Sequence, residues 1–190
     1  RQFYQSLADH FSATRMRIQP GVRRILDELP ITANILDLGC GNGELARELI
    51  QRQHQGTYIG ADFSHELLEL ARQLTPKHPN IQFVQTDLSQ PDWNQLLAAC
   101  LPTDPLPIDI ITAFAVLHHI PGYSLRCQIL NNIRDLLQPG GEFIHSEWQF
   151  LNSPRLRARI QPWERINLTD DAVDPEDYLL DWRHGEYGLR

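Results

Sequence analysis

Short apolar runs alternate with amphipathic segments through the middle of the chain. Between the apolar runs, hydrophobic residues recur at helical spacing, which predicts helices over Glu44–Arg52, Ser64–Leu74, Pro91–Ala99 and Gly122–Leu137. Runs rich in Ile, Leu, Val and Tyr that end near Gly, Asp or Pro predict strands. They lie at Asn34–Leu38, Thr57–Ala61, Ile81–Gln85, Ile108–Ala115 and Glu142–Trp148.

This alternation predicts an α/β fold, a doubly wound and mostly parallel sheet with helices on both faces. Ile108–Ala115 is continuously apolar, as expected for a strand that is covered on both sides. A helical flank over residues 1–30, with two helices split near Pro20-Gly21, precedes the core at residues 31–150. An extension over residues 151–190 follows.

The extension is acidic and irregular. It begins with a possible helix at Pro154–Ile160, and Tyr178–Leu180 is its one short candidate strand. Arg155, Arg157 and Arg159 could touch phosphate, but their spacing favours a solvated face of a short helix.

Composition indicates one globular domain. The 190 residues are 42% hydrophobic and 22% charged, and their net charge of -7 argues against a strongly basic nucleic-acid binder. Ile110–Leu117 is the best apolar run and is far too short for a membrane span. No signal-peptide pattern is present and the three cysteines form no C-x-x-C pair, so we expect a cytoplasmic protein without structural disulfides.

The first candidate for chemistry is the glycine-rich loop Gly39-Cys40-Gly41-Asn42-Gly43, between the first strand and the first core helix. Glycines there allow a sharp turn and a close approach of ligand to backbone. The loop lies at the carboxyl edge of a doubly wound sheet, where ligands bind. A plain tight turn is the alternative, and we interpret Cys40 as a small apolar contact rather than a nucleophile.

Two acids follow the next two strands. Asp62 could accept the hydroxyls of a ribose, or it could cap the helix that begins near Ser64. Asp87 could accept the exocyclic amine of adenine, or it could stabilise a turn. A cofactor containing a nucleoside, lying along this sheet edge, explains the loop and both acids together.

The loop departs from the motifs of two common cofactor classes. The dinucleotide fingerprint G-x-G-x-x-G requires a third glycine where Glu44 stands, and no Gly-Lys-Ser/Thr follows the loop. NAD and nucleoside triphosphates are therefore disfavoured.

Five ordered motifs resemble those of the class I S-adenosylmethionine-dependent methyltransferases, which have a Rossmann-like fold, and together they cover about residues 34–148. They are ILDLGCGNG (Ile35–Gly43), YIGADFS (Tyr58–Ser64), FVQTDL (Phe83–Leu88), DIITAFAVLHHI (Asp109–Ile120) and LLQPGGEFI (Leu136–Ile144).

The resemblance implies a set of contacts to S-adenosylmethionine. Asp37 and the glycine loop would hold its methionine part, and Phe114 and Ala115 would lie at its amino end. The nucleoside would be held by Asp62 at the ribose, Phe63 against adenine, and Asp87 and Leu88 at the adenine edge. The family sheet carries two further strands, which we do not find after Phe150, so we expect them to be missing.

A narrower resemblance links FYQSLADHFSATR (Phe3–Arg15), together with His118-His119, to the branch containing the tRNA wobble-uridine carboxymethyl methyltransferases. It implies that a carboxylate on a modified uridine is esterified. Alternatives are a small-metabolite methyltransferase, a non-catalytic cofactor-binding partner subunit and, more remotely, a nicotinamide oxidoreductase. With a net charge of -7, tRNA binding would need a local basic patch or an activating subunit, and a homodimer is also possible.

Four residues are candidates for contact with the methyl acceptor. Arg15 and His10 could orient a carboxylate, and His118 or His119 could act as a base or a donor. The alternatives are a solvated Arg15, a packing role for His10 and a structural role for one of the paired histidines. No third ligand is spaced with that pair, so we predict no metal site.

Overall fold

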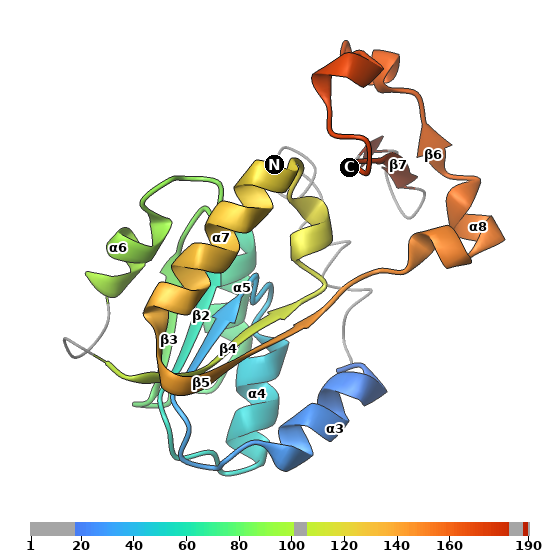
Figure 1. Ribbon diagram of the computed structural model, residues 1–190. Helices are drawn as coiled ribbons and strands as arrows, with labels where there is room; N and C mark the ends of the chain where they lie inside the picture. Colours follow the sequence, from blue (N-terminus) through green and yellow to red (C-terminus); the bar gives the residue numbers. More distant parts are fainter. Residues whose placement is uncertain (1–17, 101–105, 183–187, 190) are drawn as a thin grey trace.

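The computed structural model describes residues 18–100, 106–182 and 188–189 (Figure 1). The substrate-side candidates His10 and Arg15 lie outside these described residues. So does the first helix predicted for the N-terminal flank.

The core is a five-stranded parallel sheet with the order β3-β2-β1-β4-β5 (Figure 1). Every neighbouring pair of strands runs parallel, which confirms the predicted doubly wound, Rossmann-like fold. The strands are β1 (Ile35–Leu38), β2 (Tyr58–Asp62), β3 (Ile81–Gln85), β4 (Ile108–Phe114) and β5 (Leu137–Ser146).

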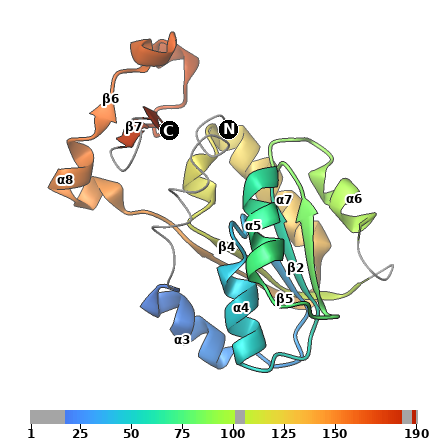
Figure 2. The ribbon, with the colours of Figure 1, turned by 180° about the vertical axis from the view of Figure 1, so that it is seen from behind.

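Helices cover both faces of the sheet (Figures 1 and 2). Successive strand residues point to opposite faces, so Ile35 packs with α3 and α4 whereas Leu36 packs with α6 and α7. Because both faces are buried, β1 and β2 carry no charged side chain except Asp37 and Asp62. The helices are α3 (Pro20–Glu28), α4 (Glu44–Gln51), α5 (His65–Leu74), α6 (Trp93–Ala98) and α7 (Tyr123–Leu136).

Two boundaries illustrate how local chemistry decides the fold. Ser64 caps α5 as predicted, since its hydroxyl oxygen accepts the Leu67 N–H at 3.2 Å. The start of β5 was predicted wrongly at Glu142. The strand begins at Leu137 and includes Pro139-Gly140-Gly141, where the pairing with β4 shifts register and Gly140 takes a φ of 84°.

The extension forms a second, small sheet of antiparallel strands with the order β6-β7-β8. The helix predicted over Pro154–Ile160 is shorter, because the chain leaves α8 (Pro154–Arg157) to form β6 (Ile160–Gln161). The candidate strand at Tyr178–Leu180 is present as β7 (Leu179–Trp182), and β8 is Gly188–Leu189. None of the described residues adds a sixth strand to the core sheet.

Acidic residues join the extension to the core. The Asp177 carboxylate accepts the Gly122 N–H at 2.7 Å and pairs with Arg126 at 2.8 Å, while Asp174 accepts the Tyr123 N–H. These carboxylates satisfy backbone donors at the start of α7 and complement its dipole. Single-turn helices η2 (Phe150–Asn152), η3 (Trp163–Ile166) and η4 (Asp170–Ala172) complete this region. In the described part of the chain, no helix has the length and apolar character needed to cross a membrane.

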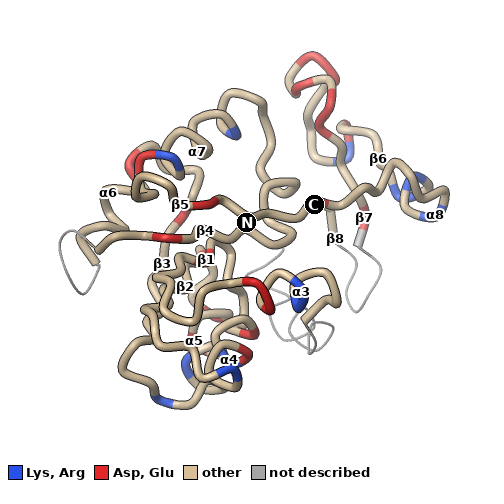
Figure 3. The backbone as a smooth tube through the Cα atoms, turned by 60° about the horizontal axis from the view of Figure 1, so that its bottom comes forward, with Lys and Arg blue, Asp and Glu red and all other residues tan. Residues whose placement is uncertain are grey.

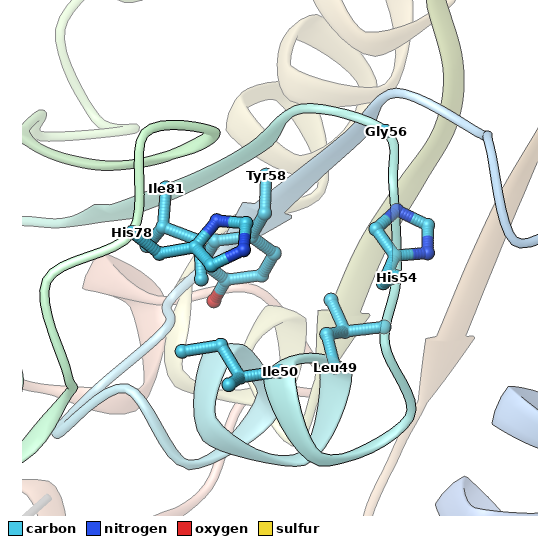
Figure 4. A pocket seen from close by; sticks show the side chains of 7 residues that line it. All are labelled: Leu49, Ile50, His54, Gly56, Tyr58, His78 and Ile81. Atoms are coloured by element: carbon cyan, nitrogen blue, oxygen red, sulfur yellow. The ribbon is translucent and has the colours of Figure 1, made fainter.

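A small pocket of about 10 Å³ lies at the amino ends of β2 and β3, at the edge opposite to the glycine loop (Figure 4). It has room for roughly one water molecule. His54 lines it, and its Nε2 lies 2.8 Å from the Ala33 carbonyl oxygen, which can only accept, so Nε2 carries a proton. Burial lowers the pKa of His54, and nearby His78 lowers it further against the opposing hydrogen bond.

His54 should therefore make the fold less stable in mild acid. The unfolded chain binds a proton near pH 6.5, whereas the folded protein resists protonation until a lower pH, so stability falls as the pH drops through that window. Urea unfolding at about pH 7.5 and about pH 5 should give a smaller pH-dependent loss for His54→Gln than for the wild type. His65→Gln, at an exposed position on α5, is the matched control and should keep the wild-type loss. Equal losses for both variants would contradict the assignment.

Candidate active site

A cleft of about 1720 Å³ lies at the carboxyl ends of the core strands and extends beneath the C-terminal extension. Gly43 does not line it, but supports the loop from behind, packed near Ala71 and Phe83. The cleft brings together most of the predicted site residues, namely Asp37, Gly39, Cys40, Gly41, Asp62, Phe63, Asp87, Leu88, Phe114, Ala115, His118 and His119.

The glycine loop is shaped by two different constraints. Gly39 and Gly41 have φ values of 71° and 56°, in the left-handed region that side chains rarely adopt. A Cβ on Gly39 would stand 2.5 Å from a methyl of Val116, so this glycine lets the β4 loop pack closely. A Cβ on Gly41 would meet no protein atom within 4 Å and would project into space that a ligand can use.

Asp37 is a buried carboxylate at the floor of the cleft. Tyr58 donates to its Oδ2 at 2.7 Å and Thr112 donates to its Oδ1 at 2.8 Å. Burial raises the Asp37 pKa to about 6, against the two hydrogen bonds, which lower it, and the nearby Asp62 adds to the increase. Sequence reasoning missed both donors, although Thr112 is the one hydroxyl residue in the apolar run of β4.

Asp62 is the last residue of β2 and holds the glycine loop. Its Oδ2 accepts the Gly41 N–H at 2.9 Å and its Oδ1 accepts the Ser64 N–H at 2.9 Å. Burial raises its pKa, while these backbone donors oppose the change. Each carboxylate oxygen has a second acceptor position, so Asp62 can stabilise the turn and still accept a ligand hydroxyl.

Residues after β3 and β4 form two further walls of the cleft. Asp87 accepts the Ser89 N–H at 3.0 Å and its hydroxyl at 2.7 Å, which fixes a turn beside the buried Leu88. Ala115 has a φ of 58°, a left-handed conformation that costs about 1 kcal/mol outside glycine. Its N–H donates to the Ser146 carbonyl at 2.9 Å, and this bond holds the end of β4 against β5.

Cys40 lies within the loop and is 8% exposed. Burial raises the pKa of its thiol well above the usual range, and the carboxylates Asp62 and Asp37 raise it further. The thiol is therefore neutral at physiological pH, and a neutral thiol is a poor nucleophile.

An aromatic and charged cluster forms the rim at the ends of β4 and β5. His118 lies in η1 (Leu117–His119), and its Nδ1 is 2.7 Å from Glu147 Oε2, which also accepts the His118 N–H at 2.9 Å. Its ring stacks on Trp148 at a centroid distance of 5.3 Å, and the His119 ring is 4.1 Å away. A carboxylate at Nδ1 fixes the ring, and Nε2 is buried in this structure.

Sequence reasoning missed Glu147, although it follows β5 just as Asp62 and Asp87 follow or end their strands. The predicted strand Glu142–Trp148 placed Glu147 inside the strand, whereas the observed strand ends at Ser146 and leaves Glu147 at its carboxyl end. Among the described residues, no group of three or more His, Cys, Asp and Glu side chains could hold a metal ion.

The arginines of the extension do not form one solvated face. Arg155 and Arg157 are exposed, as expected, but Arg159 is only 9% exposed and lines the cleft. The prediction was wrong for Arg159 because α8 ends at Arg157, and the following residues turn inward to pair β6 with β7.

The cleft fits the cofactor that the motifs imply. Acids lie along the ends of β1, β2 and β3, with Phe63 and Leu88 between them and open space above Gly41. Acids that accept hydroxyl and amine hydrogens suit the ribose, adenine and ammonium groups of S-adenosylmethionine. Glu44 beside the loop would repel a pyrophosphate.

Known proteins resemble the chain in sequence and in fold. It is 28% identical over 189 residues to the mouse tRNA (carboxymethyluridine(34)-5-O)-methyltransferase ALKBH8, covering 94% of this chain and 25% of that protein. It is 27% identical to the *Schizosaccharomyces pombe* tRNA (carboxymethyluridine(34)-5-O)-methyltransferase, covering 95% of this chain and 66% of that one. The chain therefore spans less than two thirds of either relative.

A solved structure supports the fold. The complex between the *Haloferax volcanii* Trm112 methyltransferase activator and a methyltransferase described as putative matches with a TM-score of 0.63 and 20% identity, over 90% of this chain and 68% of that chain. The family model described as "Methyltransferase domain" matches residues 36–143, from β1 to β5. The chain therefore belongs to this methyltransferase-domain family.

Proposed function

We propose that this chain transfers the methyl group of S-adenosylmethionine to the carboxylate of a carboxymethyluridine in tRNA. The observation that carries the methyl-transfer part is the single cleft that contains the glycine loop, Asp37, Asp62 and Asp87 at successive strand ends. The acceptor part is supported by relatives that are named for this substrate and match nearly the whole chain.

Each part of the cofactor has a proposed partner on the chain. Asp37 and the glycine loop hold the amino-acid part, and Phe114 and Ala115 lie at its amino end. Asp62 accepts the ribose hydroxyls, and its bonds to Gly41 and Ser64 set its orientation before the cofactor arrives. The adenine is held by Phe63, Asp87 and Leu88.

Esterification of a carboxylate requires little acid–base catalysis from the protein. Bound S-adenosylmethionine supplies a methyl group on a positively charged sulfur. A carboxylate oxygen forms a bond to the methyl carbon as the carbon–sulfur bond breaks, and that electron pair remains on sulfur. The products are a methyl ester and a thioether, and no proton is released. A carboxylate is already ionised at neutral pH, so no general base is required.

The protein's task is therefore to align the acceptor and exclude water. We propose that His118 and His119 form the acceptor side of the cleft, with Glu147 and Trp148 fixing the ring of His118. Arg15 and His10 remain proposed acceptor contacts from the N-terminal flank.

Binding of tRNA by a chain with a net charge of -7 needs basic groups that are gathered locally or supplied by a partner. The similar methyltransferase structure was solved in complex with the Haloferax volcanii activator Trm112. By analogy we propose that an activating subunit assists this chain in binding tRNA.

Cofactor binding is tested by titration calorimetry with S-adenosylhomocysteine. Asp62→Ala should weaken binding roughly tenfold or more, because it removes both the ribose acceptor and the group that holds Gly41 in place. Asp92→Ala, at an exposed position before α6, is the matched control and should bind like the wild type. A folded wild-type protein that does not bind S-adenosylhomocysteine would contradict the assignment.

Asp37→Asn should separate stability from function. At pH 7.5 the wild type carries a buried carboxylate whose pKa is raised from 3.8 to about 6, so the neutral amide should stabilise the fold by about 1 to 3 kcal/mol. The pH range of this stabilisation follows from linkage. The variant's advantage in unfolding free energy is complete above about pH 6 and disappears as the pH falls toward 3.8, where the wild-type carboxyl becomes neutral in both the folded and the unfolded state. Urea unfolding at several pH values measures this gain, and calorimetry should show weaker S-adenosylhomocysteine binding. A variant that is less stable than the wild type at every pH would contradict the prediction.

The acceptor is tested with radiolabelled S-adenosylmethionine and two anticodon stem-loops. One carries carboxymethyluridine at position 34, as in the relatives' names, and the other carries uridine. Label should enter only the carboxymethyl RNA, and mild alkali should release it, because esters hydrolyse and N-methyl groups do not. Label that resists alkali, or that enters both RNAs equally, would rule out the proposed acceptor.

A further inference from the structure

Arg159 is a buried cation that has no side-chain partner among the described residues. It is 9% exposed and lines the cleft, and its guanidinium makes no hydrogen bond or ion pair with any residue in the described ranges. The neighbouring Asp181 contacts it through the backbone, donating its N–H to the Arg159 carbonyl at 3.1 Å. An unpaired buried charge costs free energy, so its retention at a ligand-accessible wall points to a ligand that neutralises it.

Other basic side chains of the cleft are less suited to this role. Arg126 is paired with Asp177 at 2.8 Å and donates to the Ile120 carbonyl at 2.9 Å. Arg155 also lines the cleft, but it is exposed and lies on α8, before the chain turns inward at Arg159. Figure 3 shows the basic residues of α8 apart from the acids of the core.

The rest of this wall is apolar. Leu156, Leu179 and Leu180 line the cleft with Arg159, and the last two are buried. A guanidinium in such surroundings binds a planar anion strongly, because its fork of N–H donors matches two oxygens and water competes weakly.

We propose that Arg159 binds the carboxylate of the methyl acceptor, with Arg155 at the outer edge of the same subsite. This inference rests on the proposed function and adds the residue that selects an acidic acceptor. The fork of Arg159 holds both carboxylate oxygens, and each oxygen keeps a second lone pair with which it can bond to the methyl carbon. The C-terminal extension thereby supplies the specificity that the cofactor-binding core lacks.

The depth of Arg159 favours a carboxylate over an RNA phosphate. Backbone phosphates remain on the outside of a nucleic acid, whereas a base turned out of the stack carries its substituent into a pocket. Arg159, a residue that is only 9% exposed on the cleft wall, is therefore better placed for a group on the inserted base than for the RNA backbone. The exposed Arg157, which does not line the cleft, is where a phosphate contact is expected.

Equilibrium binding to the protein saturated with S-adenosylhomocysteine tests this proposal without requiring turnover. The probes are the two anticodon stem-loops that carry carboxymethyluridine or uridine at position 34. The wild type should prefer the carboxymethyl RNA. Arg159→Gln should lose roughly tenfold in affinity for that RNA and less than about twofold for the uridine RNA. Arg159→Lys, which keeps the charge without the fork, should fall between the wild type and Arg159→Gln.

Arg157→Gln is the matched control and should weaken both RNAs equally or not at all. Unchanged affinity for S-adenosylhomocysteine shows that each variant is folded. If Arg159→Gln does not fold, the comparison is made with Arg159→Lys instead. Equal losses of Arg159→Gln on both RNAs would assign the residue to phosphate and overturn the proposal, as would no loss on either.

The outcomes separate this proposal from the proposed function. If the wild type methylates the RNA in an alkali-labile way and Arg159→Gln keeps the wild-type affinity for both RNAs, the Arg159 subsite is refuted and the proposed function is retained. Carboxylate-dependent binding that needs Arg159, without methyl transfer by the wild type, would retain the subsite and refute the activity.

Discussion

The buried carboxylate of Asp37 is the point on which the centre of the molecule depends. Tyr58 reaches it from β2 and Thr112 reaches it from β4, so one side chain links the three central strands. Burial of this charge is unfavourable, as its raised pKa records, and the two hydroxyl donors compensate only in part. The helices packed on both faces of the sheet supply stability that offsets the cost of burying this charge. A costly group in the middle of a sheet is a mark of function rather than of folding.

From Asp37 the cleft is built by contacts between successive strand ends. Asp62 at the end of β2 holds the amide of Gly41 in the loop after β1, and Val116 after β4 packs against Gly39. The loop is thus fixed by two neighbours before a ligand enters. Such preorganisation reduces the entropy that binding would otherwise cost. The positive φ values of Gly39 and Gly41 disfavour larger residues at both positions.

The local sequence pattern predicted the structure correctly where a single strand or a single helix cap determined it. The strand Ile81–Gln85 and the Ser64 cap were predicted at their observed positions because period and capping chemistry are local. The donors to Asp37 and the role of Glu147 depend on which strands are neighbours, and an isolated strand does not carry that information. Pro139-Gly140-Gly141 signals a break in a helix equally well whether a loop or a bulged strand follows.

Arg159 shows the same limit for charge. On sequence alone it belongs to an alternating basic helix face, and the net charge of -7 suggests that the chain avoids anions. The tertiary structure differs from both expectations, since the antiparallel pairing of β6 with β7 turns Arg159 into the cleft wall. Meanwhile Asp174 and Asp177 are engaged at the start of α7. The electrostatic field that acts on a ligand is set by the few charged groups in the cleft that have no neutralising partner. The net charge of the whole chain does not determine it. An acidic protein can therefore present a cationic subsite to an acidic acceptor, provided that its acids are engaged elsewhere.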